Sequence, residues 1–573
     1  MNTYRVDSIN KQLILEFDKE DKEIVKAVKG VSFSSRYNPV LKIWIIPVDQ
    51  FSKQLIYPFL KRWGFKHLPT KQQVFEKYDY SLVEKQTELL ETVLGKKNFT
   101  YKPRKYQFEA LGYGIEKGSF INGDDVGLGK TFEAIMYAEY TNSFPCLVVC
   151  PASVKYNWFL KWMEIVGPQR TISVIESTET KKRPNNWNSD VTIINYDIIA
   201  KKQGKGATVK FIELATTRWK MFIFDEAHFL KEEGSQRAKV ARQITKISSG
   251  IIQLLTGTAT MSKPSELWNL LILIKKSNIF ANSFETYIQK YCNGHKDKYG
   301  WVHSGSTNLL ELNKLLRDTC YLRREKRDVL SELPPVEKVI LQVPITNQKD
   351  IDSAESDFLD FLYQSNLEKF GIEIAEEKVE SALGAETLVK LGALRKLAVE
   401  GKLKTIEQFL RDWKVGGKKL VIFGLHREPL DYLSNKFNSK LLAGGVTAIK
   451  KQEIVDNWVS NDETFLFANI SSGGTGVDGL QKVCSNMLII ELPWRPSDLE
   501  QVVGRVDRSG QTEPSTIRFM LSDSTIDKQM WKMLEEKEIA TTAANQGIDI
   551  ISEKSGMKVV MKMLVEEANL KKK

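Results

Sequence analysis

SFINGDDVGLGKTFEA, residues 119–134, is a short apolar segment followed by a turn of small residues and then by an apolar, periodic segment. Backbone N–H groups at a helix start carry partial positive charge and lack partners within the helix, so such a turn offers donors to phosphate oxygens. The turn follows the phosphate-loop pattern G-x-x-x-x-G-K-[ST], with Asp124 in place of the first glycine. It predicts that Lys130 reaches the β and γ phosphates of a nucleoside triphosphate and that the Thr131 hydroxyl binds Mg²⁺. The loop residues expected to hold this nucleotide are Asp124, Gly127, Gly129, Lys130 and Thr131.

An acidic pair follows a second apolar segment, MFIFDEAHFLK at residues 221–231. This segment predicts a short buried strand, and its carboxyl end, in a fold with a phosphate loop, is the usual place for a metal-binding Asp and a water-polarising Glu. An acidic pair can also be simply solvated, and a glycine-rich turn can be a plain connection, but the two together favour catalysis. We therefore predict that Asp225 binds the metal and that Glu226 polarises the attacking water.

The composition is that of a folded multi-domain protein, because 573 residues with 42% apolar residues suffice for several cores. The formal charge of +11 is compatible with a polyanionic partner but does not require one. The five cysteines are scattered without a C-x-x-C pair, which indicates a reducing compartment and argues against structural zinc. No run approaches about 18 apolar residues, and the N-terminus lacks a secretory apolar core, so we expect a soluble intracellular protein.

Apolar segments that alternate with helical ones predict a parallel α/β sheet in each half of the chain. The first half has them at residues 146–150, 191–199 and 251–260, and the second half at 420–426, 464–469 and 487–492. The chain is therefore expected to contain two α/β domains.

The second of these domains carries no phosphate loop but contains QVVGRVDRSGQ at residues 501–511. Arg505 and Arg508 stand three residues apart and share one face of a helix. Such arginines are ordinarily solvated; opposite a phosphate site they can neutralise the charge of γ-phosphate transfer, an effect of about 10³ to 10⁵ in rate. We predict this role, which makes hydrolysis depend on closure of the two domains.

Two segments on either side of the phosphate loop offer further contacts. Gln107, in YKPRKYQFE at residues 101–109, has an amide that can pair with adenine, although a glutamine at a helix start is also a common cap. In CLVVCPASVKYNWFLKW, residues 146–162, a strand breaks into a helix, and this turn places Ser153 where a nucleic-acid phosphate can be contacted. Trp158 is predicted to be a core residue.

The remaining segments have simpler interpretations. Residues 1–70 predict a separate small α+β module in which Tyr37 and Trp44 are expected to be core residues. Residues 71–98 are charged and helical in period and predict a connector. Residues 346–400 predict a helical insertion.

The order of these motifs resembles that of the superfamily II helicase-like ATPases and, within them, the Swi/Snf-related translocases. The matching stretches are YQ (106–107), GLGKT (127–131), CPASVKYNW (150–158), DEAH (225–228), LTGT (255–258), GGTG (473–476) and QVVGRVDRSGQ (501–511). An aspartate is common in this family at the position of Asp124. YLRREKRDVLSELPP, residues 321–335, resembles the family's signature between the two lobes.

Two regions resemble the HARP-bearing annealing-helicase branch of the family. In residues 30–48 a Tyr-x-Pro turn precedes a Lys-x-Trp-x-x-Pro strand, as in the HARP module, which is associated with binding DNA forks and single/double-strand junctions. GTATMSKPSELW (257–268) and GWVHSGSTNLLELNKLL (300–316) resemble the same branch. The departures are Ala259, Arg495 and Gln452, which stand where proline, asparagine and arginine are usual.

The resemblance implies an α/β protein with two tandem RecA-like parallel-sheet lobes, helical insertions and a small N-terminal α+β module. The expected domains are residues 1–70 as a HARP-like DNA-binding module, 71–98 as a helical connector, 99–275 as the ATP-binding lobe 1, 276–400 as helical insertions and inter-lobe linker, 401–545 as lobe 2 and 546–573 as a C-terminal tail.

The resemblance also implies roles for site residues. Arg104 and Gln107 are expected to bind the nucleotide, and Arg505 and Arg508 to complete the catalytic site from lobe 2. The residues implied in DNA contact or in coupling are Ser153, Thr256, Thr258, Ser472, Gly474, Gly476, Trp494 and Gln501.

The function implied by the resemblance is ATP-dependent, Mg²⁺-requiring translocation on duplex DNA, which remodels forks or branched DNA by annealing or branch migration. The alternatives are a strand-separating DNA or RNA helicase and an ATP-switched junction-binding protein in a repair or defence complex. No membrane partner is expected. Long disordered tails and chromatin-reading modules are not evident in the sequence, which favours the cytoplasm of a bacterial or phage-infected cell, whereas a eukaryotic protein would be nuclear.

Overall fold

The computed structural model describes residues 2–7, 12–17, 22–31, 35–38, 43–47, 56, 59–60, 62–63, 65–67, 102–178, 185–203, 206–257, 264–297, 300–303, 305–366, 384–473, 477–522 and 526–535. The connector expected at 71–98 and the tail expected at 546–573 lie outside these residues. By internal packing the chain divides into two compact units, Met1–Tyr80 and Ser81–Lys573. None of the helices described here is long and apolar enough to cross a bilayer.

The N-terminal unit is a five-stranded sheet with the strand order β3-β4-β2-β1-β5 and a helix, α1 (Lys22–Val31). The strands are β1 (Thr3–Asp7), β2 (Gln12–Glu16), β3 (Arg36–Asn38), β4 (Ile43–Pro47) and β5 (Lys66–His67). Trp44 is buried in the core of this unit, and the partly buried Tyr37 packs on it with ring centres 5.6 Å apart. The expected core positions of both side chains are confirmed.

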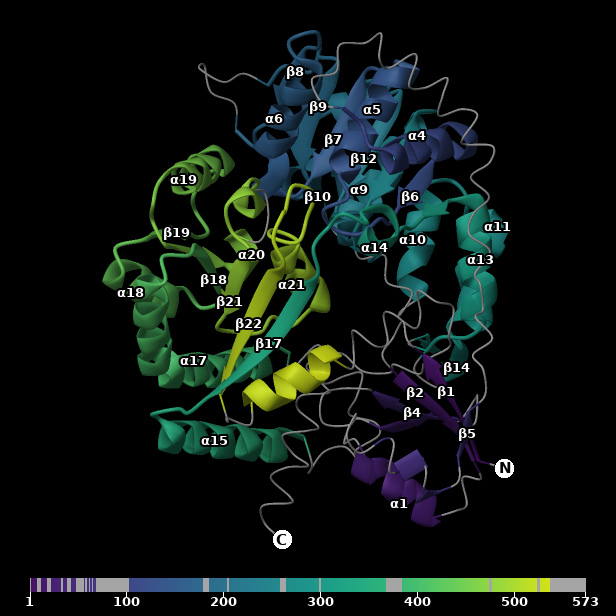
Figure 1. Ribbon diagram of the computed structural model, residues 1–573. Helices are drawn as coiled ribbons and strands as arrows, with labels where there is room; N and C mark the ends of the chain where they lie inside the picture. The colour runs from purple at the N-terminus through teal and green to yellow at the C-terminus, as the bar shows by residue number, and fades with distance from the viewer. Residues whose placement is uncertain are drawn as a thin grey trace. The chain divides into compact units, whose positions relative to one another are not determined.

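Lobe 1 is built on a seven-stranded parallel sheet with the order β16-β6-β13-β12-β7-β9-β8 (Figure 1). Its strands are β6 (Phe120–Asn122), β7 (Cys146–Cys150), β8 (Ile172–Val174), β9 (Val191–Asn195), β12 (Met221–Asp225), β13 (Ile251–Leu255) and β16 (Tyr321–Leu322). Phe222 and Phe224 belong to one apolar cluster, whereas Met221 and Ile223 belong to another. Because side chains alternate along a strand, both faces of the sheet are covered, as in parallel sheets generally.

The connections of lobe 1 are mostly helical. They comprise α4 (Lys105–Lys117), α5 (Lys130–Thr141), η1 (Ala152–Val154), α6 (Lys155–Val166), α7 (Tyr196–Ile199), α8 (Glu213–Thr216), η2 (Ala227–Leu230) and α9 (Gln236–Ile247), with the hairpin of β10 (Ala200–Gln203) and β11 (Gly206–Val209). Since all strands run in one direction, the loops after β6, β7 and β12 meet at one edge of the sheet.

The segment expected to hold insertions and the linker also supplies strands to both lobes. It contains α10 (Ser265–Leu273), α11 (Ser277–Phe280), α12 (Phe284–Tyr291), β14 (His295–Asp297), β15 (Gly300–Val302), α13 (Leu309–Thr319), α14 (Lys326–Val329), α15 (Gln348–Asn366) and α17 (Gly384–Val415). Between these, β16 pairs with β6 of lobe 1, and β17 (Val336–Val343) pairs with β22 of lobe 2. The prediction for 276–400 did not include these two strands, which are short or partly exposed and lack a continuous apolar run.

Lobe 2 has a six-stranded parallel sheet with the order β17-β22-β21-β18-β20-β19 (Figure 1). Its other elements are β18 (Leu420–Gly424), α18 (Arg427–Lys436), β19 (Lys440–Leu442), α19 (Ala448–Ser460), β20 (Phe465–Asn469), α20 (Ile470–Gly473), η3 (Leu480–Lys482), β21 (Asn486–Ile489), α21 (Pro496–Val503) and β22 (Ser515–Ser522). Val421 and Phe423 pack in one apolar cluster and Leu420 and Ile422 in another, so both faces of this sheet are buried too. The predicted α/β class with two parallel-sheet lobes is confirmed.

Candidate active site

The phosphate loop connects β6 to α5 at the centre of lobe 1. Gly127 and Gly129 adopt φ angles of 95° and 90°, a region that favours glycine over other residues. A Cβ added to Gly129 would lie 2.7 Å from the Gln107 side-chain nitrogen, so a side chain at that position would have to displace the Gln107 amide. The glycines therefore leave the backbone of the loop uncovered by side chains at the start of a 12-residue helix. This arrangement exposes N–H donors to a phosphate.

Lys130 is folded back onto this loop. Its Nζ donates to the carbonyl oxygens of Asp124 and Asp125, at 2.5 Å and 3.1 Å. Burial lowers the pKa of Lys130, and the nearby carboxylates of Glu226 and Asp124 oppose that effect. A desolvated cation whose hydrogen bonds go to neutral carbonyl oxygens is stabilised further by an anionic ligand such as a phosphate.

Asp124 has a different position from the one predicted. Its side chain is fully buried and accepts from Arg324, with Nε at 3.2 Å and 3.1 Å from the two carboxylate oxygens and the Arg324 N–H at 2.9 Å. Arg324 Nη2 also donates to Glu133 on α5, at 3.0 Å. Because these contacts use the carboxylate behind the loop, we assign Asp124 to holding the loop in place rather than to contact with the nucleotide.

Asp225 ends β12 beside the phosphate loop. Its Oδ2 accepts from the Trp158 indole at 2.8 Å, and its Oδ1 accepts from the Glu226 N–H at 3.0 Å. Burial raises the pKa of Asp225 to about 6, with the Glu226 carboxylate adding to the rise. Trp158 is buried, as predicted, but it also orients the predicted metal ligand.

Glu226 follows with a φ of 50°, in the left-handed region that non-glycine residues rarely adopt. Its Oε2 lies 3.2 Å from His228 Nδ1, and its Oε1 accepts from Gln501 of lobe 2 at 3.4 Å. Burial raises the pKa of Glu226, but His228, Lys130 and Arg505 together outweigh it, so the net shift is downward. Glu226 is therefore ionised at neutral pH and able to accept a proton. Backbone strain of this kind is concentrated at functional sites.

Gln107 and Arg104 frame the other side of the loop. Gln107 is 2% exposed, accepts from the Arg104 N–H at 3.0 Å and donates to the Leu128 carbonyl oxygen at 3.2 Å. The capping role is therefore present, and Gln107 also lies against the phosphate loop, while pairing of its amide with adenine stays a prediction. The Arg104 side chain reaches Ser509 of lobe 2 at 2.9 Å and pairs with Glu332.

Lobe 2 meets the phosphate loop directly. A Cβ at Gly504 would lie 2.8 Å from Val126, and a Cβ at Gly127 would lie 3.1 Å from Arg508 Cβ. Arg505 Nη1 donates to the Val477 carbonyl oxygen at 2.8 Å. Burial and the neighbouring Arg508 lower the pKa of Arg505 to about 10, against the pull of Asp478 and Glu226, so it stays cationic at neutral pH. The hydrolytic residues expected from the two lobes are thus brought to one place.

The residues predicted to contact DNA or to couple the lobes have varied surroundings. Thr256 is 1% exposed, and its N–H donates to the Asn122 carbonyl oxygen at 3.0 Å, so its side chain offers little surface to DNA. The Trp494 ring has the Arg395 guanidinium 4.8 Å from its centre. Ser153 lies partly exposed in η1, after β7. Thr258, Gly474, Gly476 and the side chain of Ser472 lie outside the described residues.

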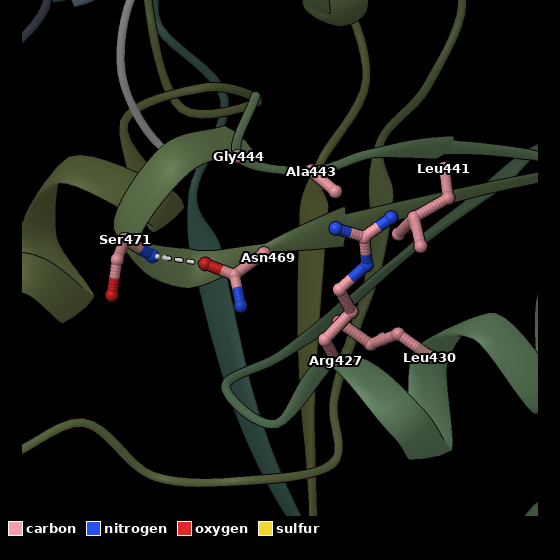
Figure 2. A pocket seen from close by; sticks show the side chains of 7 residues that line it. All are labelled: Arg427, Leu430, Leu441, Ala443, Gly444, Asn469 and Ser471. Carbon is pink, nitrogen blue, oxygen red and sulfur yellow. Dashed lines mark hydrogen bonds between the residues drawn. The ribbon is translucent and has the colours of Figure 1, made fainter. Parts of the chain in front are cut away.

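A cavity of about 350 Å³ lies in lobe 2, beyond the carboxyl ends of β19 and β20 (Figure 2). Its lining residues are Arg427, Leu430, Leu441, Ala443, Gly444, Asn469 and Ser471. The Ser471 N–H donates to Asn469 Oδ1 at 3.1 Å, which fixes the start of α20 at the rim. This cavity belongs to one lobe only and is separate from the phosphate loop.

The residues at the loop fit a nucleoside triphosphate with Mg²⁺. The fit rests on the glycine cradle, on the desolvated Lys130 and on the Asp225 carboxylate, whose pKa is raised to about 6 by its burial and by the Glu226 carboxylate, so that a cation bound beside it would be favourable. Within the described residues no group of three or more His, Cys, Asp or Glu could hold a metal ion. A metal held by Thr131 and Asp225 would therefore take its other ligands from phosphate and water oxygens, as Mg²⁺ commonly does.

Several residues of this site make contacts that the sequence did not predict. They are Arg324, His228, Lys161 and Asp478, together with Trp158 in its role as a partner of Asp225. Arg324, His228 and Trp158 lie in stretches that resemble family motifs, but the resemblance gave these side chains no role. The contacts of Arg324, Lys161 and Asp478 join segments that are distant in the chain, whereas His228 lies two residues from its partner Glu226.

Comparison with known families gives two adjacent matches. Residues 70–400 match the SNF2-related domain, and residues 401–510 match the helicase conserved C-terminal domain. The first match covers more than half of the chain.

Individual relatives agree with these matches. The chain is 26% identical over 449 residues to the SWI/SNF-related matrix-associated actin-dependent regulator of chromatin subfamily A-like protein 1 of Xenopus tropicalis, covering 75% of this chain and 44% of that protein. It is 27% identical over 462 residues to the human DNA annealing helicase and endonuclease ZRANB3, covering 77% and 40%. The chain spans about half the length of the curated relatives it matches. The Sulfolobus solfataricus SWI2/SNF2 ATPase core in complex with dsDNA is 19% identical with a TM-score of 0.37, covering 78% of this chain and 94% of that one.

Proposed function

The chain belongs to the SNF2-related family, and from this membership and the geometry of the phosphate loop we propose that it is a DNA-dependent ATPase that moves along duplex DNA and remodels forks or branched structures. The observation that carries the proposal is that the hydrolytic residues come from both lobes. Glu226 of lobe 1 accepts from Gln501 of lobe 2, and Arg508 packs against Gly127. Hydrolysis then depends on how the lobes are seated on each other.

Each residue has a distinct task in this proposal. Lys130 leaves the loop carbonyls and binds the β and γ phosphates, while Glu226 orients the attacking water and accepts its proton. Arg505 and Arg508 balance the charge that develops on the γ-phosphoryl oxygens. Mg²⁺, held by Thr131 and Asp225, would screen the phosphate charge.

The DNA-binding surface follows from the arrangement of the sheets. Ser153 lies after β7 of lobe 1, and the rim of the lobe 2 cavity, with Arg427 and Asn469, lies after β18 and β20. In parallel sheets this edge is where ligands bind. We propose that both lobes contact backbone phosphates here, which predicts binding that is largely independent of sequence and sensitive to salt.

Annealing or branch migration is the finer part of the proposal. It is supported by relatives whose names describe DNA annealing helicases and by the N-terminal unit, a separate fold whose sequence resembles a fork-binding module. The two relatives named above are animal proteins, so they do not support a preference for a bacterial source.

The test is displacement of a third strand from a triplex by the full-length protein with ATP. We expect displacement without separation of the underlying duplex, and none from Glu226→Gln, which should still bind ATP. A chain without residues 1–80 should displace the third strand equally well but lose its preference for forks. Separation of a tailed duplex would instead identify a strand-separating helicase.

A further inference from the structure

Asp478 lies between two cations that belong to different lobes. Its Oδ1 is 3.2 Å from Arg508 Nη1 in lobe 2, and its Oδ2 is 3.2 Å from Lys161 Nζ on α6 of lobe 1. One carboxylate therefore joins a predicted catalytic arginine to the opposite lobe.

The carboxylate is held firmly by its own lobe. The Asp478 N–H donates to Gln452 Oε1 at 3.1 Å, and Gln452 Nε2 donates to the Asp478 carbonyl oxygen at 2.9 Å. The Gly479 N–H donates to Asp478 Oδ1 at 2.8 Å. Gln452 therefore fixes the backbone on both sides of the Asp478 side chain.

Lys161, the partner of Asp478 in lobe 1, has two carboxylates within reach. Besides Asp478, Lys161 Nζ contacts Glu164 Oε2 on the same helix at 2.9 Å. If the lobes part, Lys161 keeps Glu164, and Arg508 keeps Asp478. Breaking the contact between the lobes thus leaves neither cation unpaired, and the contact can open and close at little cost.

Arg508 sits where this contact can affect hydrolysis. The Cβ of Arg508 lies 3.1 Å from the position that a Cβ would occupy if Gly127 of the phosphate loop had a side chain. The side chains of Lys161, Asp478 and Arg508 are 31%, 27% and 21% exposed, so water screens them only in part. Rotation of lobe 2 away from α6 would move Asp478 and Arg508 together.

We propose that Lys161 and Asp478 form a latch between the lobes that places Arg508 at the phosphate loop only when lobe 2 is seated on α6. Asp478 and Lys161 are positioning residues, and Arg508 is the residue that meets the phosphate. The proposal rests on the function proposed above. It adds the contact through which closure of the lobes becomes a condition for hydrolysis.

The protonation states favour this pairing. Burial alone would raise the pKa of Asp478, but Arg508 and Lys161 hold it well below its usual range. Partial burial likewise works against the Lys161 ammonium, but Asp478 and Glu164 outweigh it and raise the pKa of Lys161. Both groups are charged at neutral pH.

The test compares kcat and KM for ATP at saturating duplex DNA in the full-length protein. Lys161→Met should lower kcat about fivefold with little change in KM, and Asp478→Asn should lower it further. The double variant should be no worse than Asp478→Asn alone, because both changes break one latch. Lys161→Arg should restore most of the rate, and Glu164→Gln, which removes only the alternative partner, should match the wild type.

Three results would overturn the latch. The first is additive losses in the double variant, the second is a kcat unchanged by Lys161→Met, and the third is a raised rate in Asp478→Asn, which would mean that Asp478 withholds Arg508 from the nucleotide. Failure of the proposed function would look different, because wild-type turnover would then ignore DNA. In that case the same variants are compared by their ATP turnover without DNA. A double variant with Lys161→Cys and Asp478→Cys is also treated with a bismaleimide, and a crosslink between the two new cysteines shows that the lobes meet there.

Discussion

Two groups of ionisable residues flank the phosphate loop, and they differ in burial. Behind the loop, the side chains of Asp124, Glu133 and Arg324 are 0%, 4% and 5% exposed and are bound to one another within lobe 1. On the other side, Asp478 and Lys161 meet across the two lobes with 27% and 31% of their side chains exposed. The first group is enclosed by protein, and the second is reached by water.

This difference separates what must stay fixed from what must move. A buried charge that loses its partner is strongly destabilising, so the contacts behind the loop are expected to persist through a reaction cycle. An ion pair that water reaches in part contributes little net stability, and its two partners can separate at little cost in free energy. The loop is therefore held from lobe 1, while the residues proposed to complete the reaction approach it from lobe 2.

The largest expected effect is on ATP turnover and comes from a substitution in lobe 2. Arg505→Ala removes a cation that faces Glu226 and the phosphate loop, and we expect kcat for ATP to fall by about 10³. The KM for ATP should change little, because the ground-state contacts come from lobe 1. Steady-state turnover with saturating DNA measures both, and a large rise in KM with an unchanged kcat would place Arg505 in binding instead.

A substitution in the buried group behind the loop should lower the stability of the protein. Arg324→Met leaves Asp124 and Glu133 buried without their cation, and we expect the free energy of unfolding to drop by about 3–5 kcal/mol. Arg327→Met, an exposed arginine three residues on, is the matched control and should change stability by less than about 0.5 kcal/mol. Calorimetric unfolding of both variants checks this; equal stability would show that the buried group is not what holds the loop.

A smaller effect is expected at the metal site. Trp158→Phe keeps an aromatic ring in the core but removes the N–H that donates to Asp225 at 2.8 Å. The carboxylate then loses the donor that orients it, and about tenfold more Mg²⁺ should be needed for half-maximal turnover. A Mg²⁺ titration of ATP turnover at fixed ATP tests this, and Trp162→Phe, one turn further along α6, serves as the control.

The smallest effect is expected for the ion pair of Lys326 with Asp507, whose Nζ and Oδ2 lie 2.6 Å apart between the linker and lobe 2. These side chains are 14% and 15% exposed, more than those of the group behind the loop, and Lys326→Met should lower the free energy of unfolding by about 1 kcal/mol. Added salt should reduce the difference from wild type. A loss as large as that for Arg324→Met would remove the distinction between fixed and movable contacts.

The sequence predicted the elements of the fold that have strong local signals. Apolar runs such as 221–224 and 420–424 became central parallel strands, and the loop ending in Lys130 lies where the pattern indicated. The strands β16 and β17 were missed because the first has two residues and the second is partly exposed along its length. Neither has the apolar run that identifies a buried strand.

The residues proposed to react have signals in the sequence, whereas the residues that contact and support them do not. Glu226 and Arg505 belong to recognisable motifs, whereas the contact of Lys161 with Asp478 joins residues that no local pattern connects. Asp124 shows the limit of reading a motif alone, because its position in the loop suggested a nucleotide contact and its side chain turns the other way, to Arg324. Such pairings depend on how distant segments pack.

The central claim is that hydrolysis at this site requires both the two-lobe arrangement and DNA. The most direct measurement is ATP turnover by the full-length protein with no nucleic acid, single-stranded DNA, blunt duplex, a model fork and duplex RNA, with Glu226→Gln as the inactive control. We expect slow turnover alone, strong stimulation by duplex and fork DNA, and none by duplex RNA. Turnover that is equally fast without nucleic acid, or that Glu226→Gln retains, would contradict the account.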